Sequence, residues 1–303
     1  MARRKANIIT NKVPRSRSEK QVSFLANLMC VILLVLVLVP VMHAIALALS
    51  RGTAVTAGRV FLWPVDIQWT GVEMVLFETN FLPALWNSIK VTFFGTVVSL
   101  ATTVLFAYPM SRSDLKGKKF LTMVLVISMN FSGGLVPTYL LISTLGLLDT
   151  YWALILPGAL SVYNMLIIRN YFEGLPESVV ESARIDGAGD LRILWNIVLP
   201  MSTPVLATMA MLFAVGYWNN YFGASLYIQD MAKMTLPVFM RNLIADTDVL
   251  TEQVARDESS FGLLAVDSVT AAVTIMGAIP IVAAYPLCQR YLIQGITIGS
   301  EKG

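Results

Sequence analysis

Charged residues are scarce in this chain. Only 14% of its 303 residues are Asp, Glu, Lys or Arg, whereas 56% are hydrophobic, and the mean hydropathy is +0.69. Soluble domains carry roughly 25% charged residues, so the composition excludes an ordinary soluble protein and indicates an integral membrane protein. The net charge of +3 is small and indicates no nucleic-acid partner.

Cysteine and histidine are almost absent. Cys30 and Cys288 both fall inside apolar segments, where buried, inert thiols are expected rather than a disulfide. His43 is the single histidine and has no clustered Cys or carboxylate beside it in the sequence. We therefore predict no metal site, and we expect His43 to take part in helix packing.

Motifs for nucleotide binding and catalysis are also missing. Gly117-Lys118-Lys119 is not part of a phosphate-binding loop, because no Ser or Thr follows it and the G-x-x-x-x-G-K-[ST] pattern needs that hydroxyl. Nothing in the sequence resembles a nucleophile with its general base. The chain is therefore predicted not to be an enzyme and to bind no cofactor. If it transports actively, a separate polypeptide must hydrolyse ATP.

Six long apolar segments dominate the sequence, and most have about 20 residues, which lets a helix span a hydrocarbon core of about 30 Å. We predict an all-α integral membrane protein with six transmembrane helices in residues 23–293, between a basic tail (1–22) and a polar tail (294–303). The predicted helices are Phe24–Leu49, Trp86–Tyr108, Phe120–Leu141, Tyr151–Tyr171, Pro204–Tyr227 and Val266–Arg290.

The connections between these helices differ in kind. Residues 51–85 form a mixed loop with tryptophans, and residues 228–264 form a long polar loop. The third helix carries glycines, a proline and polar side chains between Asn130 and Pro137, so we expect it to be interrupted. Such backbone is tolerated at membrane depth only inside protein or along a wet cavity.

Positive charge is unevenly distributed over the two sides of the membrane. Six spans place both ends of the chain on one side, and that side carries 16 of the 22 Lys and Arg residues, against 6 on the other. Because loops rich in Lys and Arg stay inside, both termini and residues 173–200 are predicted to be cytoplasmic. The basic first tail is expected to lie near anionic lipid.

Polar, uncharged side chains stand in the spans where ionisable ones are rare. Carriers coupled to protons or sodium need ionisable groups near the midplane, whereas aromatic rings, amides and hydroxyls suit a substrate rich in hydroxyls. Any one of these groups could instead bond a neighbouring helix. The candidate pathway residues are Asn130, Ser132, Tyr163, Asn164, Trp218, Asn219 and Tyr221.

Residues 173–200 have the pattern of two short helices rather than of a turn. Pro176 suits the first position of one helix, and the glycines around Ala188 should end it. Asp190 suits the cap of a second helix, which Pro200 ends. So much order in a membrane loop indicates a docking element for a partner on that side of the bilayer.

Side-chain spacing in the first of these helices supports docking. Val180, Ala183 and Gly187 recur at helical spacing and form a narrow face of small residues. Arg184 lies three residues after Glu181, so an ion pair between them is expected. The small face predicts a close approach of the partner at Gly187.

The motif in this loop resembles the EAA loop of ABC importer permeases. That pattern is E-A-A, three residues, G, nine residues and I-x-L-P, and the chain departs from it only at Ser182. The resemblance implies a type I ABC importer permease fold in which this loop is the coupling helix, seated in a cleft of the ATPase subunit. The matching residues are Glu181, Ser182, Ala183, Gly187, Ile197, Leu199 and Pro200.

The resemblance extends over most of the chain and is strongest to the carbohydrate-importer branch. Residues 133–139, 145–154 and 218–221 are similar to that branch, and the end of the chain is similar to the tail of the smaller permease of maltose-type transporters, which reaches between the two ATPases. Overall similarity points to oligosaccharides from polysaccharides such as alginate or pectin. The tail residues carried over are Gln294, Gly295, Lys302 and Gly303.

The resemblance implies an assembly. Its members would be this permease, a second and similar permease, two ATPase subunits that hold ATP and Mg, and an extracytoplasmic sugar-binding protein, all at a bacterial cytoplasmic (inner) membrane. The permease pair would move an oligosaccharide inward by alternating access. The alternatives are a secondary sugar carrier, which needs no ATPase, and a membrane scaffold, which needs no polar pathway.

Overall fold

A computed structural model describes residues 17–131, 133–254 and 266–300, so Ser132, Lys302 and Gly303 lie outside the described residues. The longer helices are α1 (Arg17–Ala48), α4 (Phe81–Ser111), α5 (Lys118–Asn130), α6 (Leu135–Thr144), α8 (Val162–Glu173), α9 (Glu177–Ile185), α12 (Thr203–Trp218), α14 (Leu236–Val254) and α15 (Val266–Ser300). The shorter segments are α2 (Gly52–Thr56), α3 (Thr70–Glu73), η1 (Met74–Glu78), α7 (Trp152–Ile155), η2 (Leu156–Gly158), α10 (Asp190–Ile193), η3 (Leu194–Val198), α11 (Leu199–Met201), α13 (Tyr221–Tyr227) and η4 (Met231–Lys233).

Three helices of the described chain, α1, α4 and α15, are long and apolar enough to cross a membrane alone. Up to six spans result if each bent pair of helices counts as one. The pairs are α5 with α6, bent by 107°, α7–η2 with α8, bent by 53°, and the segment α10–α11 with α12, bent by 84°. The predicted all-α membrane class is therefore confirmed.

The predicted interruption of the third span is confirmed. α5 ends at Asn130, and α6 begins at Leu135 after a change of direction. Gly134, the residue before α6, has φ +87°, a conformation that L-residues with a side chain rarely adopt. This glycine lets the backbone turn where a continuous helix would have carried the chain straight on.

The fourth predicted helix is broken near Pro157. Backbone carbonyl groups at the break accept hydrogen bonds from side chains of other helices. The Tyr217 hydroxyl donates to the Ile155 carbonyl at 3.2 Å, and the Thr102 hydroxyl donates to the Ala159 carbonyl at 2.5 Å. Unpaired carbonyls are costly at membrane depth. The break is therefore stabilised by hydroxyl groups from α4 and α12.

The predicted long polar loop at 228–264 is wrong, because α14 occupies much of it. Leu236 is 1% exposed and Phe239 is 9% exposed, and the Phe239 ring packs edge-on against Phe81 with centroids 6.2 Å apart. Arg241 and Asn242 are exposed. The segment is thus an amphipathic helix, which its polar residues concealed in the sequence.

The bounds of three predicted helices also differ from the structure. α4 begins at Phe81 and keeps Pro109 within its helical bounds, instead of ending before it. The fifth span ends at Trp218, because Asn220 caps the separate α13 by accepting a hydrogen bond from the Gly223 N–H at 3.0 Å. The sixth continues as α15 to Ser300, so part of the predicted polar tail is helical.

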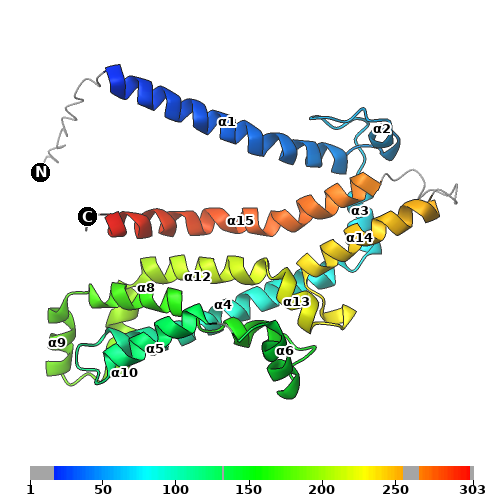
Figure 1. The fold of residues 1–303 in the computed structure, drawn as a ribbon. Coiled ribbons are helices and arrows are strands. Elements are labelled where there is room, and N and C mark those ends of the chain that lie inside the picture. Colours follow the sequence, from blue (N-terminus) through cyan, green and yellow to red (C-terminus); the bar gives the residue numbers. More distant parts are fainter. Residues whose placement is uncertain (1–16, 132, 255–265, 301–303) are drawn as a thin grey trace, which may run out of the picture.

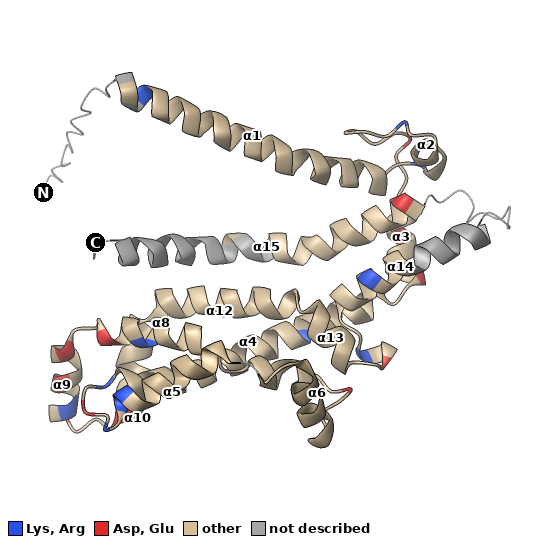
Figure 2. Cartoon of the chain, viewed as in Figure 1, with Lys and Arg blue, Asp and Glu red and all other residues tan. Residues whose placement is uncertain are grey.

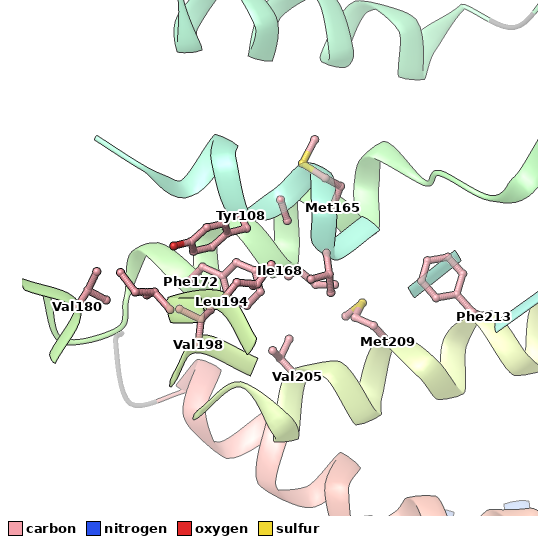
Figure 3. Packing of buried hydrophobic residues seen from close by; sticks show 13 residues of the cluster. Tyr108, Met165, Ile168, Phe172, Val180, Leu194, Val198, Val205, Met209 and Phe213 are labelled. Carbon is pink, nitrogen blue, oxygen red and sulfur yellow. The ribbon is translucent and has the colours of Figure 1, made fainter. Parts of the chain in front are cut away.

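The main core lies at one end of the bundle, where α4, α8 and α12 meet the loop of residues 173–200. Figure 3 shows this cluster of buried side chains, in which Met165 and Ile168 of α8 are fully buried beside Met209 and Phe213 of α12. α4 packs along both α8 and α12. These three helices form the unit that carries the loop.

α1 packs mainly on α15 and leaves most of its apolar surface exposed (Figure 1). Cys30 is exposed on α1, so the prediction that this thiol is buried is wrong. The His43 ring nitrogen Nδ1 lies 2.6 Å from the Phe61 carbonyl oxygen. His43 thus holds the end of α1 against the following loop.

The ends of the molecule differ in what they carry. The start of α1, the end of α15 and the helices α9 and α10 lie at one end, and α2, α3 and α14 lie at the other (Figure 1). Among the described residues, the positions of charged residues gather toward these two ends, and the middle of the bundle is almost free of them (Figure 2). This arrangement fits a bilayer that surrounds the middle.

Candidate functional site

α9 is the first half of the loop 173–200, and its two ends are well defined. It begins after Pro176, which is the residue before the helix and not its first member as predicted. At its end the Gly187 N–H donates to the Arg184 carbonyl at 3.0 Å, and the Ala188 N–H donates to the Ala183 carbonyl at 2.9 Å. This bond pair is a Schellman motif, whose left-handed residue is commonly glycine.

Gly187 therefore ends α9 and does not continue its small-residue face. Its φ is +80°, and a Cβ added there would meet no atom of the described chain within 4 Å. Val180 and Ala183 do lie on the inner side of α9, where both join the core cluster. The predicted face of three small residues is thus correct for two of them.

Arg184 connects the two halves of the loop. Its guanidinium donates to Asp190 Oδ1 at 3.2 Å and lies 3.7 Å from Asp114 Oδ2 in the α4–α5 connection. The hydrogen bond to Asp190 raises the pKa of Arg184 above its usual value. The predicted ion pair with Glu181 is wrong, since the turn at Gly187 brings Asp190 to the guanidinium instead.

The second half of the loop begins at Asp190 and runs through α10, η3 and α11. Gly189 stands at the N-cap, so Asp190 is a first-turn residue and not the cap that was predicted. Pro200 lies within α11 and does not end the helix. The preceding segment η3 is a π-helix, one of the local changes that accommodate a proline without its N–H.

The inner side of the loop belongs to the core of the bundle. Val180 of α9 is 6% exposed, and Ile193, Leu194 and Val198 are each 3% exposed or less. All four pack in the same cluster as side chains of α4 and α8, and Figure 3 labels Val180, Leu194 and Val198 among them. Because packed side chains transmit displacement, a push on the loop would reach α4, α8 and α12.

The residues of the E-A-A motif present a mixed surface. Glu181, Ser182, Gly187 and Pro200 are exposed, and Ala183, Ile197 and Leu199 are half-buried. Three large apolar side chains of the same loop are each more than 60% exposed, and none of them belongs to the motif. They are Ile185 (86% exposed), Leu191 (68%) and Trp195 (65%).

A cavity of about 430 Å³ joins three of the predicted pathway residues. Trp218, Asn219 and Tyr221 line it from the end of α12 and the start of α13, and α14 and α15 form its other wall. Arg241 of α14 and Thr274 of α15 also line it. Arg241 escaped prediction because its segment was read as a loop.

A second cavity of about 460 Å³ contains Asn164. It lies between α7, α8, α12 and α13, and Tyr217 and Asn220 also line it. The Tyr217 hydroxyl is 2.7 Å from the Ser99 hydroxyl, and Asn220 caps α13. The polar groups of this cavity are thus largely used in holding helices together.

The other predicted pathway residues lie apart from these cavities. Asn130 is exposed at the end of α5, where its side chain donates to the Val126 carbonyl at 2.8 Å. Tyr163 is 61% exposed on α8. The two residues of the predicted C-terminal tail contact that the structure describes, Gln294 and Gly295, lie within α15. The predicted pathway residues are thus not all in one place. Trp218, Asn219 and Tyr221 line one cavity, and Asn164 lines the second. Asn130 and Tyr163 line neither of them.

Comparison with known proteins gives consistent matches. Residues 19–298 match the family model described as "Binding-protein-dependent transport system inner membrane component". Protein LplC of Bacillus subtilis (strain 168) is 38% identical over 266 residues, which cover 88% of this chain and 90% of that protein. The Polygalacturonan/rhamnogalacturonan transport system permease protein YtcP of the same organism is 37% identical, covering 87% and 92%.

The fold matches a solved structure along nearly its whole length. A chain of a bacterial ABC transporter involved in the import of the acidic polysaccharide alginate superposes with a TM-score of 0.84 and 32% sequence identity. The match covers 92% of this chain and 99% of that one.

Proposed function

The chain belongs to the family of inner membrane components of binding-protein-dependent transport systems, and from this premise we propose that it is the permease subunit of an ATP-driven importer of acidic oligosaccharides. It spans a bacterial inner membrane several times and carries no catalytic site. Separate ATPase subunits bind ATP and Mg and perform the hydrolysis. Both of its termini and the loop 173–200 face the cytoplasm.

The observation that carries this proposal is the outer surface of the loop. Ile185, Leu191 and Trp195 are each at least 65% exposed, and large exposed apolar side chains on a loop that leaves the membrane mark a protein interface. The partner that this surface fits is the ATPase subunit, whose cleft receives α9. Val180 and Leu194 on the inner side then pass its movement to the bundle.

The substrate is proposed from the chemistry of the first cavity. The Trp218 ring suits stacking on a sugar face, and the Asn219 amide suits hydroxyl groups. Arg241 adds a permanent positive charge, and no carboxylate of the described chain pairs with it. A guanidinium beside an aromatic ring fits a sugar that carries a carboxylate, and the similar solved structure belongs to a transporter described as importing the acidic polysaccharide alginate.

The rest of the assembly follows from the proposed role. A second permease completes the translocation path, and an extracytoplasmic sugar-binding protein delivers the substrate to the end that carries α13 and α14. Closure of the two ATPases pushes the loop, and the permease pair exchanges between inward-facing and outward-facing states. No ionisable side chain is required at mid-membrane, since ATP supplies the free energy.

Purification with native partners tests the role of the chain. The permease, isolated from its own membrane, should bring with it an ATPase and a second permease. In proteoliposomes the ATPase should turn over faster when the loaded binding protein is added. Transport without any ATPase would establish the secondary carrier instead, and a complex that transports nothing would establish the scaffold.

Charge selectivity tests the substrate. Arg241→Gln should lower uptake of a uronate oligosaccharide about tenfold, as expected for the loss of one charge-assisted hydrogen bond, and should lower uptake of a neutral oligosaccharide far less. Arg59→Gln is the matched control, because Arg59 is exposed in the loop after α2 and lines neither the cavity at Trp218 nor the cavity at Asn164. Equal loss for acidic and neutral sugars would assign Arg241 to structure and contradict an acidic substrate site.

Trp218→Ala separates a pathway role from a packing role. A pathway role predicts lost uptake while the ATPase still responds to the loaded binding protein, whereas a packing role predicts loss of both activities or poor expression. Asn219→Ala should behave like Trp218→Ala, because both side chains line the same cavity. Parental uptake by both variants would place the sugar contacts elsewhere.

A further inference from the structure

A third cavity, of about 480 Å³, lies between the bundle and α9. Its walls come from the end of α4, the start of α5, the end of α8 and the inner side of α9. Three cations line it: Arg112, Lys118 and Arg169. The residues of the E-A-A motif do not line this cavity, so neither the motif nor the sugar pathway accounts for it.

Positive charge exceeds negative charge in this cavity. The carboxylates that line it are Glu173 and Glu177. Glu173 is already held by two cations, since its Oε1 lies 2.7 Å from Lys118 Nζ and 3.0 Å from Arg169 Nε. One lining cation is therefore left over for an anion from outside the chain.

Arg112 is the remaining cation. Its guanidinium carbon lies 5.8 Å from the centre of the Tyr108 ring, and no carboxylate within the described ranges forms an ion pair with it. Asp114 and Asp190, which belong to the neighbouring loops, are held by Arg184. The buried Arg112 Nε has no hydrogen-bond partner in the described chain.

A buried hydroxyl faces the same cavity. Tyr108 is only 6% exposed, it lines the cavity, and its hydroxyl also lacks a hydrogen-bond partner among the described residues. Figure 3 shows this hydroxyl on the side of the cluster where Val180 of α9 lies. Buried polar groups are normally paired. Two unpaired donors, one in the last turn of α4 and one on the residue that follows the helix, therefore point to a ligand that accepts hydrogen bonds.

The depth of the cavity favours one kind of anion. Tyr108 and Arg112 stand at the end of the apolar helix α4, and Lys118 stands at the start of α5, which is the level of lipid headgroups when the spans fill the hydrocarbon core. On α5, directly after Lys118, Phe120 is 63% exposed and Leu121 is 43% exposed. That apolar surface suits an acyl chain below a headgroup.

We propose that this cavity binds the phosphate of an anionic phospholipid from the cytoplasmic leaflet, with Arg112 and the Tyr108 hydroxyl as its donors. The cytoplasmic placement rests on the proposed function. A phosphate diester supplies two unesterified oxygens, which match a guanidinium fork and a hydroxyl. Because Glu177 and Val180 of α9 form the opposite wall, the bound lipid lies against the coupling helix and stabilises its seat on the bundle.

The test compares lipid retention by variants of the purified transporter. The complex is reconstituted in nanodiscs of phosphatidylcholine with or without phosphatidylglycerol, and native mass spectrometry counts the phosphatidylglycerol molecules that stay bound. Arg112→Gln should reduce retention about tenfold, and Tyr108→Phe should reduce it severalfold while keeping the ring. Lys116→Gln is the control, because Lys116 is an exposed cation of the same loop that does not line the cavity.

Each outcome decides the proposal. Parental retention in both Arg112→Gln and Tyr108→Phe, or equal loss in Lys116→Gln, would overturn it, and the Tyr108→Phe result stands even if Arg112→Gln unfolds. If inorganic phosphate displaces the bound phosphatidylglycerol, the cavity is a site for free anions, and the proposal that its ligand is a lipid is overturned. If Arg112→Gln instead releases the ATPase and keeps the lipid, the cavity receives an acidic protein side chain. Retention needs no ATP hydrolysis, so it is measured independently of transport.

Discussion

The end of α9 shows how one residue sets the shape of the loop. Gly187 holds φ +80° and donates to the Arg184 carbonyl, and this places Asp190 within 3.2 Å of the Arg184 guanidinium. The turn therefore fixes the angle between α9 and α10. Ile185 and Leu191, the exposed apolar residues on either side of the turn, owe their relative positions to it.

We predict that substitutions at Gly187 act through this turn. Gly187→Leu should cost about 1–2 kcal/mol of local stability, because a left-handed conformation is strained in residues with a Cβ, and sugar-stimulated ATP hydrolysis should fall severalfold with membrane insertion intact. Gly187→Asn should stay near the parental rate, since Asn tolerates this conformation. ATPase assays on the reconstituted transporter measure both variants.

Gly189→Ala is the control for Gly187, because Gly189 has φ −72° and open space around it. It should leave ATP hydrolysis unchanged. If Gly187→Asn is as inactive as Gly187→Leu, the turn is not the cause. A close approach of the ATPase to Gly187, as the small-residue pattern predicts, would then be the better explanation.

Residue spacing predicted the motif but not the partners of single side chains. The distances in sequence from Glu181 through Gly187 to Pro200 were enough for the family resemblance, which the family match confirms. The pairing of Arg184 was mispredicted, because Asp190 reaches it only through a left-handed turn. The apolar residues Ile185 and Trp195 were missed, since exposure depends on the packing of the whole loop.

At the scale of helices, Tyr217 joins three segments of the bundle. Its hydroxyl lies 2.7 Å from the Ser99 hydroxyl of α4 and donates to the Ile155 carbonyl of α7 at 3.2 Å. Its ring packs on Gly95, where a Cβ would come within 2.8–2.9 Å of the ring atoms. The two hydrogen bonds hold the Tyr217 hydroxyl, and the backbone at Gly95 lies against its ring. The side chain of Tyr217 therefore has little freedom to move.

We therefore predict that Gly95→Ala destabilises the bundle by about 1–3 kcal/mol, the usual cost of overpacking. The added methyl group must push a ring that two hydroxyl contacts hold in place. Gly216→Ala is the matched control in α12, because nothing lies within 4 Å of its Cβ position. Thermal unfolding in detergent should show a lower midpoint for Gly95→Ala only, and an unchanged midpoint would mean that the ring shifts freely.

Sequence reasoning placed the breaks in the helices better than their ends. Glycine and proline predicted the interruption between Asn130 and Pro137, because they change the backbone locally. α14 was missed because counting polar residues over 228–264 hid its apolar side, which packs on Phe81 and α15. The partners of this apolar side, by contrast, come from segments far apart in the sequence, so the spacing within α14 does not predict them.

At the scale of the whole molecule, length separates the part inside the membrane from the part outside. α15 has 35 residues and is thus about 52 Å long at 1.5 Å per residue, whereas the hydrocarbon core is about 30 Å thick. The helix ends at the same end of the molecule as α9 and α10 (Figure 1). Its last turns therefore extend past the hydrocarbon core, at the end of the molecule that also carries the loop 173–200.

This geometry predicts a role for the end of the chain in ATP hydrolysis. Deleting residues 299–303 should lower sugar-stimulated ATPase activity at least twofold while the complex still assembles, because the removed segment starts at the end of α15, at the same end of the molecule as the proposed ATPase site. Replacing Glu301 by Gly and Lys302 by Ser keeps the length and tests whether these two charged side chains matter, because positions 299, 300 and 303 already hold Gly or Ser. Size-exclusion chromatography checks assembly, and steady-state phosphate release measures the activity. Parental turnover in the deletion variant would show that the helical extension ends without a functional contact, and coupling would then depend on the loop 173–200 alone.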